Sequence, residues 1–313
     1  MLRPQISRLL SLLALGACAQ SCSLVSNLDR FKQADGGSPA AAGAGDSGAS
    51  DAAADAGTPI GCGNPATLCI NLEGFKKYAG HLVVLDLVSE AGELRARAML
   101  DPATEEAAQA VILPRAIPED EIPTAQQEHP LHLEVWADLD DDRAYTPDAD
   151  QGFRVGLPQN AVVEFTQNDA DAVDLTPQPT PIGGSFQMDL SSFKIHPKRM
   201  FEAMVIDAAT GRSVGLTRFR PIPDTGKFSV EIPGIIDTKS GGGVAYDIQF
   251  YVDVNNSGGY DLIPVDHAWV MTRESDASGL HIVRTHSAPS SGPDKDDPSY
   301  DFHDLDYQFT FQK

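Results

Sequence analysis

Two copies of one pattern, an alternating strand that runs into an acidic turn, organise this chain. The clearer copy spans 251–269 and contains Asp-Val-Asn-Asn-Ser-Gly-Gly-Tyr-Asp, while a degenerate copy spans 136–153. The first acidic residues of the two turns, Asp138 and Asp253, are 253 − 138 = 115 positions apart. Upstream of the turns, Phe75 and Phe193 are 193 − 75 = 118 positions apart. Offsets that agree this closely indicate a tandem duplication, so two similar halves must each adopt the same fold.

The segments around these turns have the pattern of short β-strands. Most alternate apolar and polar residues at period two, which places one set of side chains in a core and the other in solvent. The predicted strands are 81–88, 93–100, 110–113, 131–137, 185–190, 200–206, 213–219, 228–232, 246–252, 268–271 and 305–311. Because so many short strands fit in each half, we predict an all-β fold of two tandem antiparallel β-sandwich domains, immunoglobulin-like or transthyretin-like.

Changes in composition along the chain predict the domain boundaries. Residues 1–18 have the pattern of a lipoprotein signal peptide. Residues 19–60, rich in Ala, Gly, Ser and Asp, cannot bury enough apolar surface to offset ordering entropy and are predicted to form a flexible tether. We assign 61–176 to the first β-sandwich repeat, 177–184 to a proline-rich linker and 185–313 to the second repeat.

The N-terminus has the pattern of a bacterial targeting segment. An apolar run from Leu9 to Ala17 follows a short basic region and is too short to span a bilayer as a stable helix. The run ends in Leu-Gly-Ala-Cys, which resembles the lipobox of bacterial lipoproteins and implies a lipid anchor at Cys18. We expect the chain at the cell envelope, on the outer membrane or its periplasmic face. An ordinary cleaved signal would instead make it a secreted protein.

Cysteine pairing leaves an alternative position for the anchor. Cys62 and Cys69 are spaced for a local disulfide in an oxidising compartment. Lipidation of Cys18 would then leave Cys22 unpaired. Lipidation of Cys22 would remove Cys18 with the signal, but the preceding Ala-Gln-Ser is a poorer lipobox. We therefore place the anchor at Cys18 and keep Cys22 as the alternative.

The charge balance limits the classes of partner. The chain has 23 Lys and Arg against 45 Asp and Glu, a net charge of -22. This excess of negative charge repels phosphate backbones, so we expect no nucleic-acid partner. The expected partners are a membrane, through the lipid anchor, and a protein or glycan that the sequence does not identify.

The acidic turns suggest calcium binding. In a tight turn, oxygen ligands at alternate positions converge on one point, and a glycine at the sixth position permits the bend. The predicted ligands are Asp138, Asp140, Asp142 and Asp150 in the first turn and Asp253, Asn255, Ser257, Asp261 and Asp266 in the second. Neither turn has an acidic residue at position 12 and strands flank both, so they are not EF-hands.

Two alternatives to calcium remain open for these turns. Asp and Asn side chains commonly cap their own turn, which would leave a solvated hairpin without a cation. In the first turn Arg143 stands where the second has Gly258, and its guanidinium could replace the cation by pairing with the carboxylates. The first turn has the higher charge, and the second has the better calcium spacing.

Alignment of the two halves singles out three of the eight histidines. Each aligns with a residue of another type in the first half: His196 with Tyr78, His267 with Gln151 and His303 with Asn168. A site kept in one copy and lost from the other would leave this pattern. Three imidazoles suit zinc or copper with one open position, whereas a chance distribution of histidines is the competing interpretation.

Several stretches of the second half together carry a resemblance to a known family. They are His196, 253–261, Asp266-His267-Ala-Trp269 and Phe302-His303-Asp304. They resemble a domain of secreted bacterial proteins of unknown function, whose pattern has Asp-x-Asn-Gly-Asn-Gly-x-Tyr-Asp, then Asp-His-x-Trp-Arg and Phe-x-His-Asn. The chain departs from it at positions that include Ile195, Ser257, Val270 and Asp304. The resemblance implies a cation-loop sandwich and supplies no activity.

These observations favour a non-enzymatic module. Within the sequence there is no Gly-x-Ser-x-Gly elbow and no His-Glu-x-x-His pair, and the carboxylates lie in turns that suit cations better than sugar hydrolysis. The first hypothesis is a cell-envelope lipoprotein for binding or envelope structure, with calcium-stabilised hairpin loops. The alternative is a copper or zinc binding or redox module that uses His196, His267 and His303.

Overall fold

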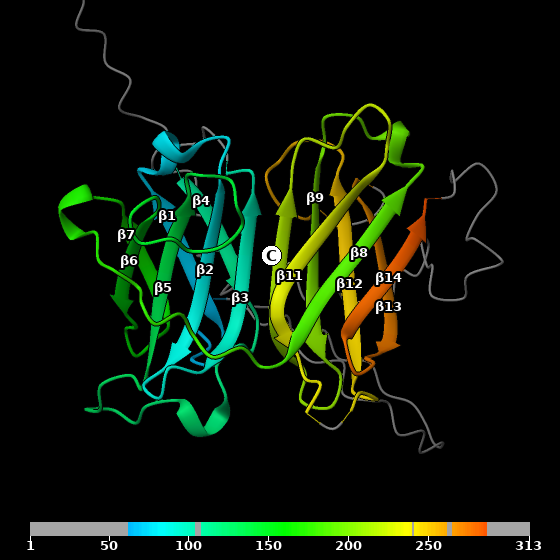
Figure 1. The fold of residues 1–313 in the computed structure, drawn as a ribbon. Coiled ribbons are helices and arrows are strands. Elements are labelled where there is room, and N and C mark those ends of the chain that lie inside the picture. The colour runs from blue at the N-terminus through cyan, green and yellow to red at the C-terminus, as the bar shows by residue number, and fades with distance from the viewer. Residues whose placement is uncertain (1–61, 104–107, 240, 262–264, 287–313) are drawn as a thin grey trace, which may run out of the picture. The chain divides into compact units, whose positions relative to one another are not determined.

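The computed structural model describes residues 62–103, 108–239, 241–261 and 265–286, all of which belong to one compact unit, 45–313. Every helical or strand element within these ranges is a β-strand or a short 3-10 helix (Figure 1). The predicted all-β sandwich class is therefore confirmed. None of the helices in the described ranges is long and apolar enough to cross a bilayer.

Each repeat contributes seven strands in the same order. The first repeat has β1 (Leu68–Glu73), β2 (Leu82–Ser89), β3 (Leu94–Asp101), β4 (Ala108–Leu113), β5 (Leu131–Asp138), β6 (Gln151–Gly156) and β7 (Val162–Thr166), with 3-10 helices η1 (Phe75–Tyr78), η2 (Glu119–Glu121) and η3 (Asp169–Asp171). The second has β8 (Gly184–Ser191), β9 (Met200–Asp207), β10 (Arg212–Phe219), β11 (Phe228–Ile236), β12 (Ala245–Asp253), β13 (His267–Glu274) and β14 (Gly279–Thr285), with η4 (Phe193–Ile195). The predicted strand 305–311 lies outside the described residues.

The strands form three sheets that repeat one topology. The three-stranded sheets have the orders β4-β1-β7 and β11-β8-β14, and an eight-stranded sheet has the order β13-β12-β9-β10-β3-β2-β5-β6. Most pairings are antiparallel, but β1 with β7, β8 with β14 and β3 with β10 are parallel. Alternation along single strands predicts a half-buried strand and carries no information about these parallel, long-range partners.

The large sheet crosses the boundary between the repeats. Its two central strands, β3 and β10, are equivalent strands of the two repeats and run parallel, so the operation that superposes one repeat on the other reverses the faces of the sheet. On β10, a Cβ at Gly215 would contact Ile232 and Ile235 of β11. The next residue, Leu216, lies in the core of the first repeat. The two small sheets therefore cover opposite faces (Figure 1).

Two apolar cores lie between the large sheet and the small sheets, and each includes side chains from both repeats. The first core contains Met204, Ile206 and Leu216 from the second repeat beside residues of the first. The second core contains Leu82, Val84 and Trp136 from the first repeat. Burial of apolar area at about 25 cal/mol per Å² therefore stabilises both repeats and the boundary between them.

Candidate metal centre

The fold places His196 just after the end of β8, the central strand of the second repeat's small sheet. Ser192 has a left-handed backbone (φ 65), which turns the chain out of β8 into η4. Phe193 is fully buried, and its backbone N–H donates to Gly226 O at 3.0 Å. The N–H of His196 in turn donates to Phe193 O at 2.9 Å. This anchored turn fixes the direction of the His196 side chain.

Two further histidines reach the same place from strand ends. His267 is the first residue of β13 and pairs with Val252 of β12. His286 directly follows β14, and its backbone N–H donates to Ser191 O at 2.8 Å, at the end of β8. Three segments that are distant in sequence therefore meet at one end of the second repeat.

The imidazole nitrogens converge on one point. His196 Nε2 lies 3.0 Å from His267 Nδ1 and 3.1 Å from His286 Nε2. One nitrogen from each of the three rings lies within 4.8 Å of the other two. Tetrahedral zinc with bonds of about 2.0–2.1 Å requires ligand nitrogens roughly 3.3 Å apart. The two separations from His196 Nε2 are within about 0.3 Å of this value, and the third is at most 4.8 Å, so the donor set fits such an ion after a small adjustment.

The environment keeps the rings of His196 and His267 neutral. His196 and His286 are each only 5% exposed. Burial, followed by the nearby His267, His286 and Arg199, lowers the pKa of His196 to about 3, and burial also lowers the pKa of His267. A metal ligand must offer an unprotonated nitrogen, so these two rings are ready to bind a cation at neutral pH.

Aromatic rings form the base of the cluster. The Phe193 ring lies 4.9 Å from the His286 ring, and the Trp269 ring lies 5.2 Å from it. Both aromatic residues are buried in the second core. Such an apolar surround restricts ring rotation and excludes water from one side of a bound ion.

The structure brings together two of the three histidines predicted from sequence. His196 and His267 are in the cluster, whereas His303 lies outside the described residues. His286 was not predicted. The pairing of β14 with β8 matches that of β7 with β1, because His286 and Gln167 donate to equivalent carbonyls, Ser191 O at 2.8 Å and Glu73 O at 2.9 Å. This register matches Gln167 with His286. The next residue, Asn168, therefore matches the position after His286 and not His303.

The corresponding place in the first repeat holds a hydrogen-bonded polar network. Tyr78 and Gln151 match His196 and His267, and the Tyr78 hydroxyl donates to Gln151 Oε1 at 2.6 Å. Lys77 Nζ donates to the same oxygen at 3.0 Å and pairs with Asp169. Here a hydroxyl and an amide that share an ammonium group stand at the positions of the His196 and His267 imidazoles.

The acidic turns share one backbone framework in both repeats. In the first turn, Asp138 accepts from the N–H groups of Asp142 (3.2 Å) and Arg143 (2.9 Å), and Asp150 accepts from Leu139 (2.8 Å) and Thr146 (2.7 Å). All four bonds recur in the second turn. There Asp253 accepts from Ser257 and Gly258, and Asp266 accepts from Val254 and Asp261. These carboxylates cap their own turns.

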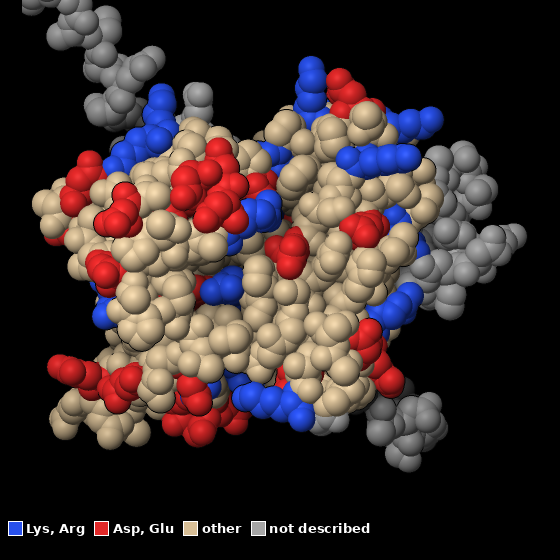
Figure 2. Space-filling model, in the orientation of Figure 1, with Lys and Arg blue, Asp and Glu red and all other residues tan. Residues whose placement is uncertain are grey.

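The first turn also gathers three carboxylates. One oxygen from each of Asp138, Asp140 and Asp150 lies within 4.8 Å of the others. Figure 2 shows acidic side chains crowded at this end of the first repeat. Asp142 accepts from the N–H of Ala144 at 2.8 Å and is outside this group. Arg143 forms its ion pair with Asp101 at 2.9 Å, outside the turn.

The second turn has a different polar arrangement. The Asn255 amide donates to Asp261 Oδ2 at 2.8 Å, and the Ser257 hydroxyl donates to Gly259 O at 3.0 Å. No group of three carboxylates comparable to that of the first turn occurs here among the described residues. Burial, partly offset by hydrogen bonds from the backbone of Asp261 and Val254, raises the pKa of Asp266 to about 6.

The N-terminal cysteine pair lies beside the first strand. A disulfide joins Cys62 to Cys69 of β1. The predicted anchor Cys18, its alternative Cys22 and the tether lie outside the described residues.

Comparisons with known proteins give structural neighbours only. No protein-family model and no curated protein matches the chain. The TIE protein of Bacillus anthracis matches at 8% identity and a TM-score of 0.19 over 70% of this chain, which spans 33% of that protein's length. A tip fimbrial protein of Porphyromonas gingivalis has 9% identity and a TM-score of 0.19 over 67% of this chain and 80% of its own. A shaft pilin of Lactobacillus rhamnosus has 11% identity and a TM-score of 0.18 over 71% and 98%.

Proposed function

We propose that the second repeat binds one zinc or copper ion through His196, His267 and His286, and that the chain is a non-enzymatic metal-binding module of the cell envelope. The observation that supports this proposal is the convergence of three imidazole nitrogens, two of them on buried residues. Asp and Glu ligands are absent from this group, which favours a borderline or soft metal over calcium or magnesium.

Three protein ligands leave one tetrahedral position for a water molecule or an external ligand. His267 is the most exposed of the three, so such a ligand would enter from the side of the cluster on which His267 lies. His196 and His286 would hold the ion against the aromatic base formed by Phe193 and Trp269. The residues thus bind and orient an ion while they leave part of its coordination sphere accessible.

The test is elemental analysis of the full chain, purified without a histidine tag and dialysed with zinc or copper. We expect about one metal ion per chain in the wild type. The double variant His196→Asn/His286→Asn should lose it. The control His281→Asn removes an exposed β14 histidine outside the cluster and should keep it. Absence of bound metal in the wild type, or its retention in the double variant, would overturn the proposal.

A second proposal concerns calcium in the first acidic turn. Asp138, Asp140 and Asp150 converge there, and a carboxylate oxygen that accepts one N–H still has a lone pair for a cation. We expect calcium to raise the melting temperature of the full chain. Asp140→Asn should weaken this effect because Asp140 is exposed and does not cap the turn with both oxygens, whereas Asp148→Asn is the matched control. Equal responses in the two variants would contradict calcium binding by these residues.

The anchoring of the chain remains a proposal that rests on the Leu-Gly-Ala-Cys lipobox. Mass spectrometry of the mature N-terminus should find a lipidated Cys18, and Cys18→Ser should release the chain from membranes. A lipid on Cys22, unaffected by Cys18→Ser, would move the anchor to the alternative position. The resemblance to secreted bacterial domains with cation loops also supports this proposal of envelope localisation.

A further inference from the structure

A polar cavity lies where the two repeats meet, away from the histidine cluster. Its volume is about 210 Å³. The walls come from the start of β3, the segment that joins the repeats, the start of β10 and the end of β11. Thr180 of the joining segment binds the first repeat, because its N–H donates to Gly92 O and its carbonyl accepts from Leu94, both within 2.9 Å. Both repeats therefore build the cavity.

Arg212 is the unusual group in the wall. Its Nη2 donates to Ala116 O at 3.3 Å. Its Nε is buried, and no described residue accepts a hydrogen bond from it. No carboxylate of the described residues lies within ion-pair distance of this guanidinium. Burial lowers the pKa of Arg212, but arginine keeps its proton in proteins. Glu121, Asp207 and Asp120 attract this charge from beyond ion-pair distance, so a positive charge and an unsatisfied buried donor lie in the cavity wall without a directly paired carboxylate.

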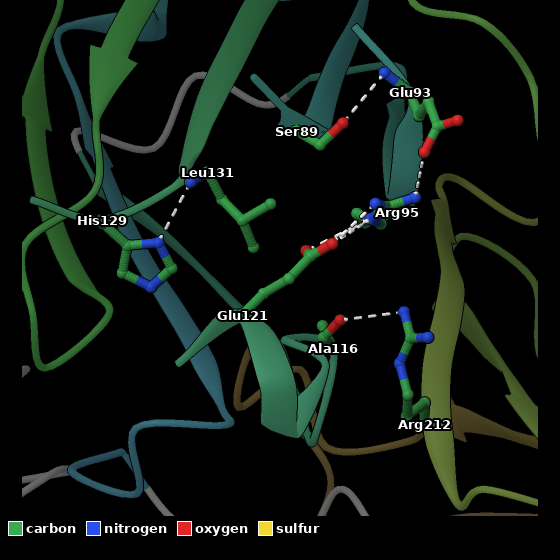
Figure 3. Close-up of polar contacts among 8 residues, drawn as sticks. All are labelled: Ser89, Glu93, Arg95, Ala116, Glu121, His129, Leu131 and Arg212. Atoms are coloured by element: carbon green, nitrogen blue, oxygen red, sulfur yellow. Dashed lines mark hydrogen bonds and ion pairs between the residues drawn. The ribbon is translucent and has the colours of Figure 1, made fainter. Parts of the chain in front are cut away.

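Arg95 in the same wall shows what a neutralised guanidinium looks like here. Glu121 accepts from its Nε at 3.0 Å and its Nη2 at 2.6 Å, and Glu93 accepts from its Nη1 at 2.8 Å. Figure 3 shows both carboxylates directed at Arg95, while Arg212 donates to the carbonyl of Ala116. The two arginines are close enough for their charges to interact. Arg95 forms ion pairs with two carboxylates, and Arg212 forms none with the described residues.

We propose that this cavity binds a small organic monocarboxylate, whose carboxylate oxygen accepts from Arg212 Nε. A planar carboxylate matches the side of a guanidinium, and a charge-assisted bond there would satisfy the buried donor. Val214 and Ile235 supply apolar wall for the body of the ligand. The volume is below the roughly 300 Å³ at which pockets for drug-sized ligands begin, so the ligand is small.

Other charges in the wall decide between anions. Asp207, Asp237 and Lys239 also line the cavity, so with Glu93, Arg95 and Arg212 its wall carries three charges of each sign. It therefore has no excess of positive charge to balance a multiply charged anion such as phosphate. Asp207 and Asp237 each accept backbone N–H groups from their own turn, so neither is directed at Arg212 by those bonds. A ligand with one carboxylate, and with a hydroxyl or ammonium group toward Asp237 or the Tyr246 hydroxyl, fits this pattern best.

The test follows the Arg212 Nε–H resonance in the ¹⁵N-labelled full chain, assigned by its loss in Arg212→Lys. Sodium acetate is the probe, with sodium chloride at equal ionic strength, acetamide and inorganic phosphate as comparisons. We expect a saturable downfield shift with acetate and none with chloride or acetamide, since only a carboxylate both accepts the bond and carries the charge. Phosphate should bind more weakly than acetate.

Two variants separate cavity binding from a general charge effect. Acetate binding, followed through backbone resonances, should weaken by about tenfold or more in Arg212→Lys, as expected for loss of a charged hydrogen bond. Thr180→Tyr, which places a ring at the cavity wall and leaves every charge in place, should also weaken it. The matched control Arg154→Lys removes a guanidinium from β6, at the sheet edge, and should have no effect. An equal shift with chloride, unchanged binding in Thr180→Tyr, or tighter phosphate binding would overturn the proposal.

Discussion

Tyr78 and His196 occupy the same position in the two repeats. Each follows a buried phenylalanine, Phe75 or Phe193, at the end of a short 3-10 turn. Tyr78 donates its hydroxyl proton to Gln151, and His196 contacts His267, the residue equivalent to Gln151. The backbone that presents a metal ligand is therefore retained in the first repeat, while the side chains there satisfy one another.

This equivalence predicts that a metal site can be built in the first repeat. The variant Tyr78→His/Gln151→His/Gln167→His places three imidazoles on the retained backbone, and Lys77→Ala removes the ammonium group that donates to Gln151. Metal stoichiometry, measured by elemental analysis, should rise from about one to about two ions per chain. A control that keeps Gln151 offers two imidazoles and should bind the second ion at least about tenfold more weakly. An unchanged stoichiometry would show that the two sites are not equivalent.

Acid should destabilise the metal-free chain through His196. Its pKa is about 3 in the folded chain, and an unfolded histidine titrates near about 6.5. Between these values the unfolded state binds a proton that the folded state does not, so the free energy of unfolding falls as pH decreases from about 6.5 toward 3. Thermal melts across this range should show the fall. The His196→Asn variant should show a smaller one, and an equal fall in both would assign the effect to other groups.

Most of the strands could be predicted from the sequence because their pattern is local. β2, β5, β9 and β12 alternate or are continuously apolar between clear turn residues, and they appear within a residue or two of the predicted positions. β14 could not be predicted in this way. It exposes the apolar Val283 (73%) and buries the charged Arg284 (5%). This is the reverse of the buried-apolar, exposed-polar alternation by which a strand is recognised in a sequence.

The same strand explains why His286 was not predicted. Neither β7 nor β14 was among the predicted strands, so alignment by sequence could not match them and placed the third histidine at His303. The signal that identifies His286 is the parallel pairing of β14 with β8, which is a long-range contact. His196 and His267 follow motifs that both repeats keep, Phe-Lys and the acidic turn, and sequence alone was enough for them.

Both acidic turns have a left-handed backbone at their sixth position, although only the second turn has glycine there. Arg143 has φ 65, and Gly258 at the equivalent position has φ 81. A left-handed conformation costs a non-glycine residue roughly 1–2 kcal/mol, whereas the half-exposed Arg143 to Asp101 ion pair contributes about 0–1 kcal/mol. Arg143→Gly should therefore raise the free energy of unfolding by about 0.5–1 kcal/mol in chemical denaturation. The neighbouring Ala144→Gly serves as control and should lower it, and a loss of stability in Arg143→Gly would refute this account.

Gly226 should prove to be a positioning residue for the metal centre. Its φ is +63, and a Cβ there would lie 2.1 Å from Lys194 N and 2.6 Å from Phe193 C, in the turn that carries His196. Gly226→Ala must displace that turn, so we expect a loss of roughly 3 kcal/mol in the free energy of unfolding and at least about tenfold weaker zinc binding.

Gly243 provides the matched control for this substitution. It has φ +83, and no atom lies within 4 Å of the position that a Cβ would take, so Gly243→Ala adds the left-handed penalty of about 1–2 kcal/mol and no clash. Denaturation curves and competition with a zinc chelator would measure both variants. If zinc affinity falls only in Gly226→Ala, the turn positions His196 for the ion. Equal affinities in the two variants would mean that the ion does not depend on this turn, and that His196 is not among its ligands.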